Sequence, residues 1–457
     1  MMRALRIAVL LTLASALACA RKSSNGSVLE AGPADGMLPS SCIAAPSEAT
    51  GSLFGLFAAS AGDVNADGFD DIIVGAPNLD DDEETGSAFV FLGGPQGAQT
   101  ESVTRIQPTA VGGMPDFGWS ATGVGDVDAD GFDDVAVGAR NANTVYLYGG
   151  SAAGIALSSE RILRPADSAT RSFGSAVAPA GDVNADGYDD ILVGAALTDV
   201  STGTGDMEFA VGSVHLFFGG GEYDGALAEQ AIPRPPGAVA GGLFGISVDS
   251  AGDVDADGYA DVVVTGVGSD AWVYPGGAAG LQPERAVALV AGGSTGGSPS
   301  LGAPVSYVGD IDGDGFSDVA ARALTWNEVT ASPTVHLFNG TAQATSPVSV
   351  LQVPAAAPDA DQGSGSYIAG GDLNGDGAPD LVVTGWGDEG ETLVLWNTDA
   401  NYDVGNATAV LRSASDGTSI GSSPSIRADI DGDGLRDLVI GGDREVCIFL
   451  GKTFDDQ

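Results

Sequence analysis

One pattern of oxygen-bearing side chains recurs seven times along this chain of 457 residues. Each copy fits D-x-[DN]-x-D-G-x-x-D, and the first copy runs from Asp63 to Asp71. Alternate residues of such a loop converge on one point when the chain turns sharply at its glycine, and they then offer the roughly six to eight hard oxygen ligands that Ca²⁺ takes. We therefore predict that up to seven Ca²⁺ ions bind the side chains at positions 1, 3, 5 and 9 and the main-chain carbonyl at position 7 of each copy. These residues are Asp63, Asn65, Asp67, Phe69, Asp71, Asp126, Asp128, Asp130, Phe132, Asp134, Asp182, Asn184, Asp186, Tyr188, Asp190, Asp253, Asp255, Asp257, Tyr259, Asp261, Asp310, Asp312, Asp314, Phe316, Asp318, Asp372, Asn374, Asp376, Ala378, Asp380, Asp429, Asp431, Asp433, Leu435 and Asp437.

Other metals and other loop types fit this pattern less well. The loops contain no Cys or His, which disfavours zinc and copper, and Mg²⁺ demands tighter octahedral geometry. An EF-hand carries glutamate at position 12, whereas these copies carry Val74, Val137, Val193, Val264, Ala321, Val383 and Ile440. A solvated acidic turn is an adequate explanation of one copy, but it explains seven copies poorly.

The spacing of the copies indicates the elements that position them. Their first aspartates recur at intervals of 56 to 71 residues, a period typical of propeller blades. Each unit holds four extended segments separated by Gly-rich turns, and 70 of the 457 residues are glycine. Four antiparallel strands make one propeller blade. The sequence therefore predicts an all-β fold, a seven-bladed β-propeller over residues 38–457.

The last unit lacks one strand. It ends after its third extended segment, Val446–Leu450, so its fourth strand must come from elsewhere. The segment Ser41–Ala44 precedes the first unit and can supply this strand, which would close the ring at the N-terminal end of the propeller. Cys42 and Cys447 then lie on neighbouring strands, and in an exported chain we expect them to form a disulfide. Two unrelated buried thiols are the alternative.

Two dipeptides flank the acidic loop and carry a family resemblance. In the second unit, Phe117-Gly118 precedes the loop and Gly138-Ala139 follows it. With the loop between them, these pairs resemble the FG-GAP repeat of the integrin α-chain propeller, and the resemblance covers residues 38–451. Later units depart from the Gly-Ala pair and carry Thr265-Gly266, Ala321-Arg322, Thr384-Gly385 and Gly441-Gly442 at its place.

The resemblance implies that the calcium hairpins occupy one face of the propeller and that ligands bind loops on the other face. On that second face we expect long loops at Pro77–Thr85, Leu197–Val211 and Ala323–Pro333, and such loops on a rigid scaffold are where binding sites are usually built. We therefore expect a non-enzymatic, adhesion-type surface protein, a monomer, that recognises a protein or a glycan. The alternative is a polysaccharide lyase or hydrolase on a calcium-stabilised propeller.

The N-terminal residues predict export. Arg3 and Arg6 precede the apolar run Ile7–Leu13, as in a signal peptide, here over residues 1–19. Its end, Ala16-Leu17-Ala18-Cys19, resembles the lipobox of bacterial lipoproteins, in which Cys19 would be lipidated, although leucine is usual where Ala16 stands. This implies an outer-membrane lipoprotein or cell-surface protein that meets the membrane only through its lipid. Cleavage at an A-x-A site would instead give a secreted or periplasmic protein, and residues 20–37 have the composition of a flexible linker.

Charge and histidine content exclude some functions. The net charge of −45 disfavours nucleic acid as a partner. His215 and His336 are the only histidines, and they occupy the third-strand position at which other units carry Phe89, Tyr146, Trp272 and Cys447, which favours a packing role. No Ser-His-Asp or Cys-His arrangement follows from the sequence.

Overall fold

The computed structural model describes residues 39–49, 53–78, 85–109, 116–198, 200–201, 207–208, 211–221, 227–235, 242–266, 271–290, 300–326, 331–341, 349–352, 367–386, 391–397, 409–411, 420–442 and 444–451. The predicted signal peptide (1–19), the lipidation site Cys19 and the linker (20–37) lie outside these residues, so they stay predictions.

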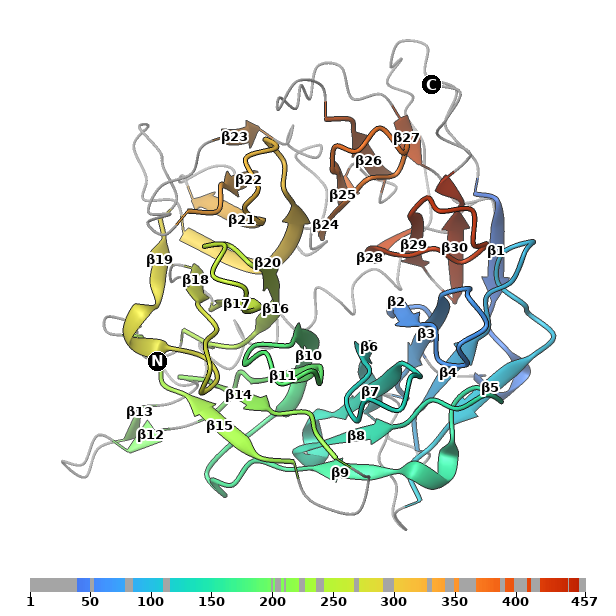
Figure 1. Cartoon of the computed structure of the whole chain (residues 1–457), viewed down its shortest axis with the longest axis horizontal. Coiled ribbons are helices and arrows are strands. Elements are labelled where there is room, and N and C mark those ends of the chain that lie inside the picture. Colours follow the sequence, from blue (N-terminus) through green and yellow to red (C-terminus); the bar gives the residue numbers. More distant parts are fainter. Residues whose placement is uncertain are drawn as a thin grey trace.

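Seven four-stranded antiparallel sheets are arranged in a ring (Figure 1), which confirms the predicted seven-bladed propeller. Blades 1 to 3 consist of β2 (Phe57–Gly62), β3 (Asp71–Ala76), β4 (Ser87–Phe91) and β5 (Val103–Ile106); β6 (Phe117–Gly125), β7 (Asp134–Ala139), β8 (Thr144–Tyr148) and β9 (Arg161–Leu163); and β10 (Phe173–Gly181), β11 (Asp190–Ala195), β14 (Ser213–Phe217) and β15 (Glu229–Ile232). Blades 4 to 6 consist of β16 (Ser247–Gly252), β17 (Asp261–Thr265), β18 (Ala271–Tyr274) and β19 (Val287–Leu289); β20 (Ser300–Gly309), β21 (Asp318–Trp326), β22 (Ala331–Phe338) and β23 (Ser349–Gln352); and β24 (Ile368–Gly371), β25 (Asp380–Trp386), β26 (Glu391–Leu395) and β27 (Ala409–Leu411). Blade 7 consists of β28 (Ile420–Ala428), β29 (Asp437–Gly442), β30 (Glu445–Phe449) and β1 (Ser41–Ala44).

Other elements of the described residues are short. They are the 3-10 helices η1 (Ser47–Ala49), η2 (Arg140–Ala142), η3 (Leu157–Ser159) and η4 (Pro283–Arg285), and a small hairpin of β12 (Val200–Ser201) and β13 (Met207–Glu208).

The hydrophobic cores lie between neighbouring blades. The second strand of blade 1, β3, is buried along its whole length because a blade covers each of its faces. Ile72 and Val74 point to one face and pack in a core with Ile448 of blade 7. Ile73 points to the other face and packs in a core with Tyr146 of blade 2. Burial on both faces explains why this strand is a continuous apolar run rather than an alternating one.

The Phe-Gly and Gly-Ala pairs of neighbouring blades contact each other. Gly118 of blade 2 has φ +90°, and a Cβ on it would press against the main-chain oxygen of Ser87 in blade 1. A Cβ on Gly75, in the Gly-Ala pair of blade 1, would press against the carbonyl oxygen of Gly118. The same contact joins Gly138 to Gly174 in the next pair of blades. The motif glycines are therefore needed where two blade backbones approach closely.

The ring closes in blade 7, as the incomplete last unit predicts. β1 pairs antiparallel with β30, and the order of the sheet is β1-β30-β29-β28. Cys42 lies directly opposite Cys447, and the structure joins them by a disulfide with a Cα–Cα distance of 4.1 Å. The bond links residues that are 405 positions apart, so both ends of the propeller are held in one sheet.

One predicted loop is wrong. The sequence predicts a long irregular loop at Ala323–Pro333, but β21 continues to Trp326 and β22 begins at Ala331, with Trp326 paired with Ala331. The reason is that Leu324, Thr325 and Trp326 extend a strand that already has a pairing partner, and such residues favour strands. Part of the predicted loop in blade 3 likewise forms the β12–β13 hairpin, and residues 79–84 of the loop in blade 1 lie outside the described residues.

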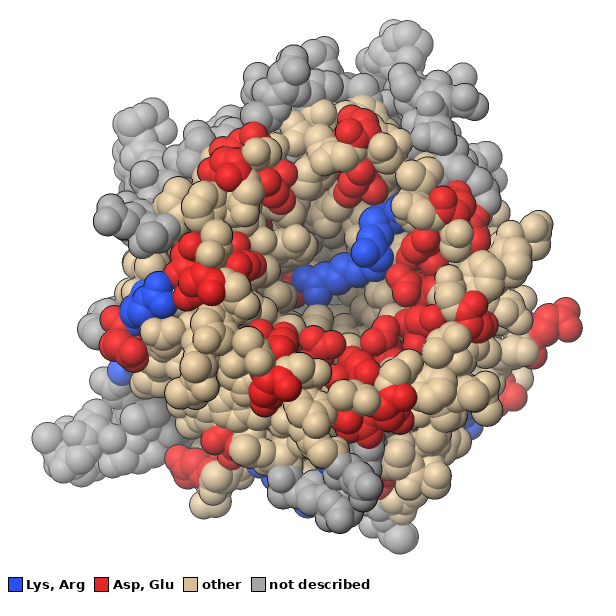
Figure 2. All heavy atoms as spheres, in the orientation of Figure 1, with Lys and Arg blue, Asp and Glu red and all other residues tan. Residues whose placement is uncertain are grey.

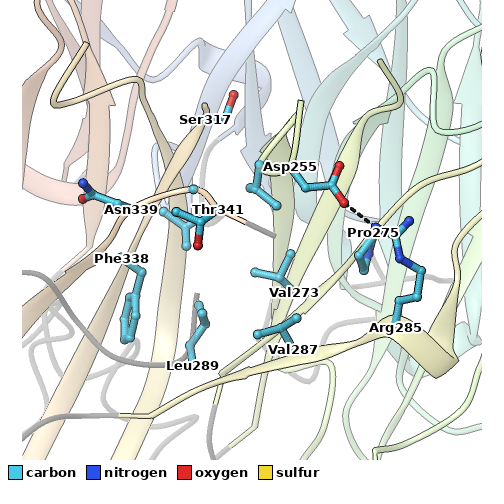
Figure 3. Close-up of a pocket in the computed structure, with 13 residues that line it drawn as sticks. Asp255, Val273, Pro275, Arg285, Val287, Leu289, Ser317, Phe338, Asn339 and Thr341 are labelled. Atoms are coloured by element: carbon cyan, nitrogen blue, oxygen red, sulfur yellow. Dashed lines mark hydrogen bonds and ion pairs between the residues drawn. The ribbon is translucent and has the colours of Figure 1, made fainter. Parts of the chain in front are cut away.

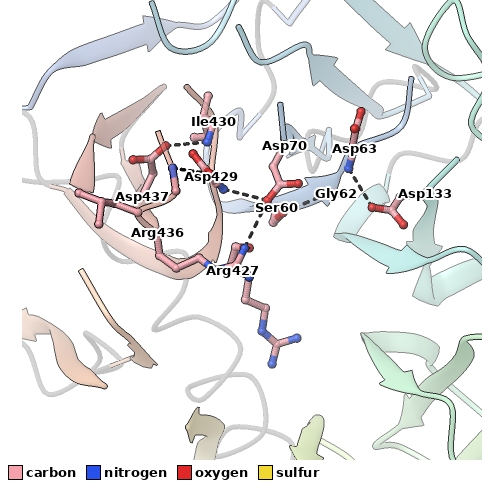
Figure 4. Close-up of polar contacts among 12 residues, drawn as sticks. Ser60, Gly62, Asp63, Asp70, Asp133, Arg427, Asp429, Ile430, Arg436 and Asp437 are labelled. Carbon is pink, nitrogen blue, oxygen red and sulfur yellow. Dashed lines mark hydrogen bonds and ion pairs between the residues drawn. The ribbon is translucent and has the colours of Figure 1, made fainter. Parts of the chain in front are cut away.

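An arginine crosses the centre of the ring near the acidic loops. Arg427 of β28 donates from Nη2 to Oδ1 of Asp249 in β16, at 2.7 Å, and so joins blade 7 to blade 4. Asp249 also accepts the N–H of Ser250, the N–H of Tyr307 and the hydroxyl of Ser306. Figure 2 shows acidic side chains gathered around the central opening with basic side chains across it, and Figure 4 shows Arg427 pointing away from its own blade.

Candidate metal centres

The acidic loop of blade 1 is a compact turn that its own side chains organise. Asp63 accepts the N–H of Asp67 on Oδ1 at 3.0 Å and the N–H of Gly68 on Oδ2 at 2.8 Å. Asn65 also accepts the N–H of Asp67, and Asp67 accepts the N–H of Phe69. In all seven loops the position-1 carboxylate accepts the N–H of the position-6 glycine. The main chain therefore curls around the side chains that we predict to bind metal.

Two left-handed residues close this turn. Gly68 at position 6 has φ +89°, and a Cβ there would meet nothing within 4 Å, so conformation rather than space requires glycine. Position 4 is also left-handed, at φ 55° for Ala66. The last three loops carry glycine at position 4, where an L residue is costly; these are Gly313, Gly375 and Gly432.

The position-9 aspartates are the buried members of the loops. All seven are 0% exposed. Asp71 accepts the N–H of Val64 at 3.0 Å on one oxygen and that of Gly93 at 2.7 Å on the other, which ties the loop to the end of the third strand. Burial raises the pKa of Asp71 to about 7, against the lowering effect of these two bonds. Burial likewise raises to about 7 the pKa values of Asp190, Asp261, Asp380 and Asp437. A bound cation would return such carboxyls to their ionised form.

Position 3 is stabilised in two different ways. Where it is asparagine, its Nδ2 donates to the position-5 aspartate within the loop, as Asn65 does to Asp67 at 2.9 Å. The same bond forms in blades 3 and 6. Where position 3 is aspartate, two carboxylates face each other, and a donor from outside the loop reaches the position-3 carboxylate in blades 4 and 5. Arg285 does so for Asp255 and Asn339 for Asp312.

Four loops bring three carboxylates close enough to share one cation. In each, one oxygen from positions 1, 3 and 9 lies within 4.8 Å of the other two; the sets are Asp126, Asp128 and Asp134; Asp253, Asp255 and Asp261; Asp310, Asp312 and Asp318; and Asp429, Asp431 and Asp437. The side chain of Asp255 is only 5% exposed, and within the described residues no donor reaches its Oδ1. Convergent oxygen ligands that include a buried acceptor lacking a donor fit a hard cation such as Ca²⁺. Coordination by positions 5 and 7 stays a prediction.

The loops also join neighbouring blades, which the sequence analysis did not anticipate. Asp133, at position 8 in blade 2, donates its N–H to the carbonyl oxygen of Asp63 at 3.2 Å and accepts the N–H of Asp63 on Oδ2 at 2.8 Å. Asp70 and Asp429 repeat both bonds between blades 1 and 7 (Figure 4). The sequence signal is the Asp-Asp doublet that ends the first three loops. A loop that held a metal would therefore also stabilise the interface between two blades.

One hydrogen-bonded relay lies apart from the metal loops. His215 Nε2 is 2.9 Å from Ser213 Oγ, and its Nδ1 is 2.6 Å from Glu229 Oε1. These hydrogen bonds connect the three side chains in the order of a Ser-His-acid triad. The sequence did not predict them, because Glu229 lies on the next strand, β15, and no motif links it to Ser213 and His215. The imidazole is 2% exposed, however, and blade 5 repeats the hydroxyl–imidazole pair with Thr334 and His336. Recurrence at a buried position favours the packing role predicted for these histidines.

Comparisons with known proteins identify the repeat. Residues 55–91 match the FG-GAP repeat model, and residues 126–193 match the FG-GAP-like repeat model. Integrin alpha-4 of Xenopus laevis is 34% identical over 155 residues, which is 33% of this chain and 15% of that protein. Integrin alpha-5 of Xenopus laevis is 31% identical over 168 residues, or 34% of this chain and 16% of that protein. Human integrin alpha-7 is 36% identical over 138 residues, or 29% of this chain and 11% of that protein.

These alignments span less than a fifth of the integrins' own length. A solved structure, the Dos1 propeller, aligns over 90% of this chain and 94% of that chain, with 10% identity and a TM-score of 0.45. No helix within the described ranges is both long and apolar enough to cross a bilayer. Residues 55–91 and 126–193 therefore carry FG-GAP-type repeats, and about a third of the chain is similar to integrin α chains.

Proposed function

We propose that this chain is an exported, calcium-stabilised propeller that binds a protein or a glycan through the loop face opposite the acidic turns and catalyses no reaction. The observation that carries the proposal is the acidic loop itself, which recurs in all seven blades with the same hydrogen bond from the position-6 glycine to the position-1 carboxylate. The likeness to integrin α propellers supports a binding role. We extend the proposal to a monomer that is anchored by lipid at Cys19.

Calcium would be held by positions 1, 3, 5, 7 and 9 of each loop. These positions carry 25 of the 62 acidic residues, and each bound ion would add two positive charges where carboxylates repel one another. Because the unfolded chain lacks the converged ligands, binding to the folded state alone raises stability. Calcium is therefore expected to raise the melting temperature substantially above its value in EDTA. An equal melting temperature in calcium, magnesium and EDTA would argue against calcium sites.

Ligand binding is tested by applying the purified protein to a glycan array and to polysaccharide substrates, with and without calcium. Calcium-dependent capture of a glycan without product release is the expected result. Turnover of a polysaccharide would instead support the alternative, a lyase or hydrolase. Once a glycan is found, replacing residues 197–211 by a short turn is expected to weaken its capture, because this loop extends from the ligand face. Mass spectrometry of the N-terminal peptide tests lipidation of Cys19.

A further inference from the structure

The metal loop of blade 4 has a positive charge placed on two of its carboxylates. Arg285, the last residue of η4, contacts Oδ2 of Asp255 at 2.6 Å through Nη2 and Oδ2 of Asp257 at 3.3 Å through Nη1. These aspartates are positions 3 and 5 of the loop. Figure 3 shows the guanidinium of Arg285 reaching the carboxylate of Asp255 beside the loop. The blade-4 loop thus has a counter-charge before any metal arrives.

Arg285 occupies only one oxygen of each carboxylate. Oδ1 of Asp257 accepts the N–H of Tyr259 at 3.2 Å, and Oδ1 of Asp255 has no donor within the described residues. One oxygen of Asp255 also lies within 4.8 Å of ligand oxygens of Asp253 and Asp261. A cation on Oδ1 of Asp255 and the guanidinium on Oδ2 could therefore share this carboxylate. Arg285 need not leave when a cation binds, but it stays next to it.

Solvent partly screens the positive charge of Arg285. The side chain of Arg285 is 43% exposed. A cavity of about 50 Å³ lies beside Asp255 and Arg285, and blade 5 contributes Ser317 and Thr341 to its lining (Figure 3). A cavity of this size can hold water, so the repulsion between Arg285 and a bound cation is screened. We therefore expect an effect of about tenfold on affinity, the equivalent of roughly 1.4 kcal/mol.

We propose that Arg285 is a built-in counter-ion that stabilises the metal-free loop of blade 4 and lowers its affinity for Ca²⁺. The inference rests on the proposed calcium binding. Without metal, the facing carboxylates of positions 3 and 5 repel each other, and Arg285 relieves that repulsion. With metal, the same charge repels the dication. Loops with asparagine at position 3 relieve the repulsion by a neutral hydrogen bond and avoid this penalty.

Terbium luminescence can report this loop separately. Tb³⁺ prefers oxygen ligands as Ca²⁺ does, and a nearby tyrosine sensitises its emission. Tyr259 stands at position 7 in blade 4 and Tyr188 stands there in blade 3. The variant Y188F therefore leaves the blade-4 loop with its own tyrosine, and Y259F leaves the blade-3 loop with its own. Titration of each variant, with and without R285Q, gives the affinity of each loop for Tb³⁺.

In the Y188F protein, R285Q is expected to strengthen Tb³⁺ binding about tenfold and to lower the melting temperature in EDTA. R285K keeps the charge and is expected to keep the weak affinity. R164Q, which removes an exposed arginine elsewhere, is the matched control for net charge. In the Y259F protein, R285Q is expected to leave binding unchanged.

Two results would overturn the inference. Unchanged or weaker Tb³⁺ binding in Y188F/R285Q would show that Arg285 does not oppose the cation. An equal gain in the Y259F protein would show a general charge effect rather than one on blade 4. If neither tyrosine sensitises Tb³⁺ and calorimetry detects no Ca²⁺ binding, the proposed calcium binding fails as well, which separates the two failures.

Discussion

Removal of the ring-closing disulfide is expected to be the most damaging small change to this propeller. The bond joins residues 405 positions apart, and the chain-entropy relation for a loop of that length gives about 6 kcal/mol at 25 °C. Disulfides typically contribute about 2–4 kcal/mol, so we take roughly 3 kcal/mol as the lower expectation. Without the bond, β1 is held by its four-residue pairing with β30, by the hydrogen bonds that Ser40 and Ala45 make to blade 7 at either end of it, and by the buried side chain of Ile43.

The assay is urea denaturation of C42S/C447S and of the parent at one calcium concentration, followed by circular dichroism and by tryptophan fluorescence. The double variant is expected to unfold at a lower urea concentration, and the parent in reducing agent is expected to behave like the variant. A midpoint equal to that of the parent, or free thiols at both positions in the non-reduced protein, would refute the reasoning.

Three further predictions follow from particular contacts. Gly118→Ala is expected to cost at least about 2 kcal/mol more in urea denaturation than Gly131→Ala, because both glycines have φ near +90° but only Gly118 lies against another blade; equal losses would contradict this account of the motif. A double-mutant cycle with Arg427→Gln and Asp249→Asn is expected to give a coupling of roughly 0.5–2 kcal/mol, and no coupling would mean that the ion pair across the ring does not hold in solution. Burial lowers the pKa of His336 to about 4, so the unfolded chain binds more protons between pH 6.5 and 4 and stability falls as the pH drops through that window, by about 3 kcal/mol. His336→Phe is expected to remove this part of the pH dependence of the melting temperature, and an unchanged profile would count against a neutral buried imidazole.

Sequence and structure agree best where the physical cause is local. The acidic loop spans nine residues, and its turn is fixed by hydrogen bonds from Asp63 to its own main chain and by the left-handed glycine at position 6. The bond from the position-6 glycine to the position-1 carboxylate and the left-handed conformation of that glycine are present in every copy, so the cause of the turn lies within the pattern itself. The prediction of a loop at Ala323–Pro333 was wrong because β21 and β22 stay paired as far as Trp326 and Ala331. These two strands are longer than their counterparts in the other repeats, so comparing the repeats did not reveal the pairing.

By itself, the sequence determined the number of blades, the four strands in each, the place of each acidic loop and the pair of cysteines that closes the ring. All of these follow from short patterns and from their spacing. Only the tertiary structure decided which side chains meet across blades, such as Asp133 with Asp63, Arg427 with Asp249 and Arg285 with Asp255. The first two contacts join different blades, and the third depends on how η4 packs against the acidic loop. The distances between these side chains depend on how the seven blades pack and curve into a ring. No single segment of the chain specifies that packing.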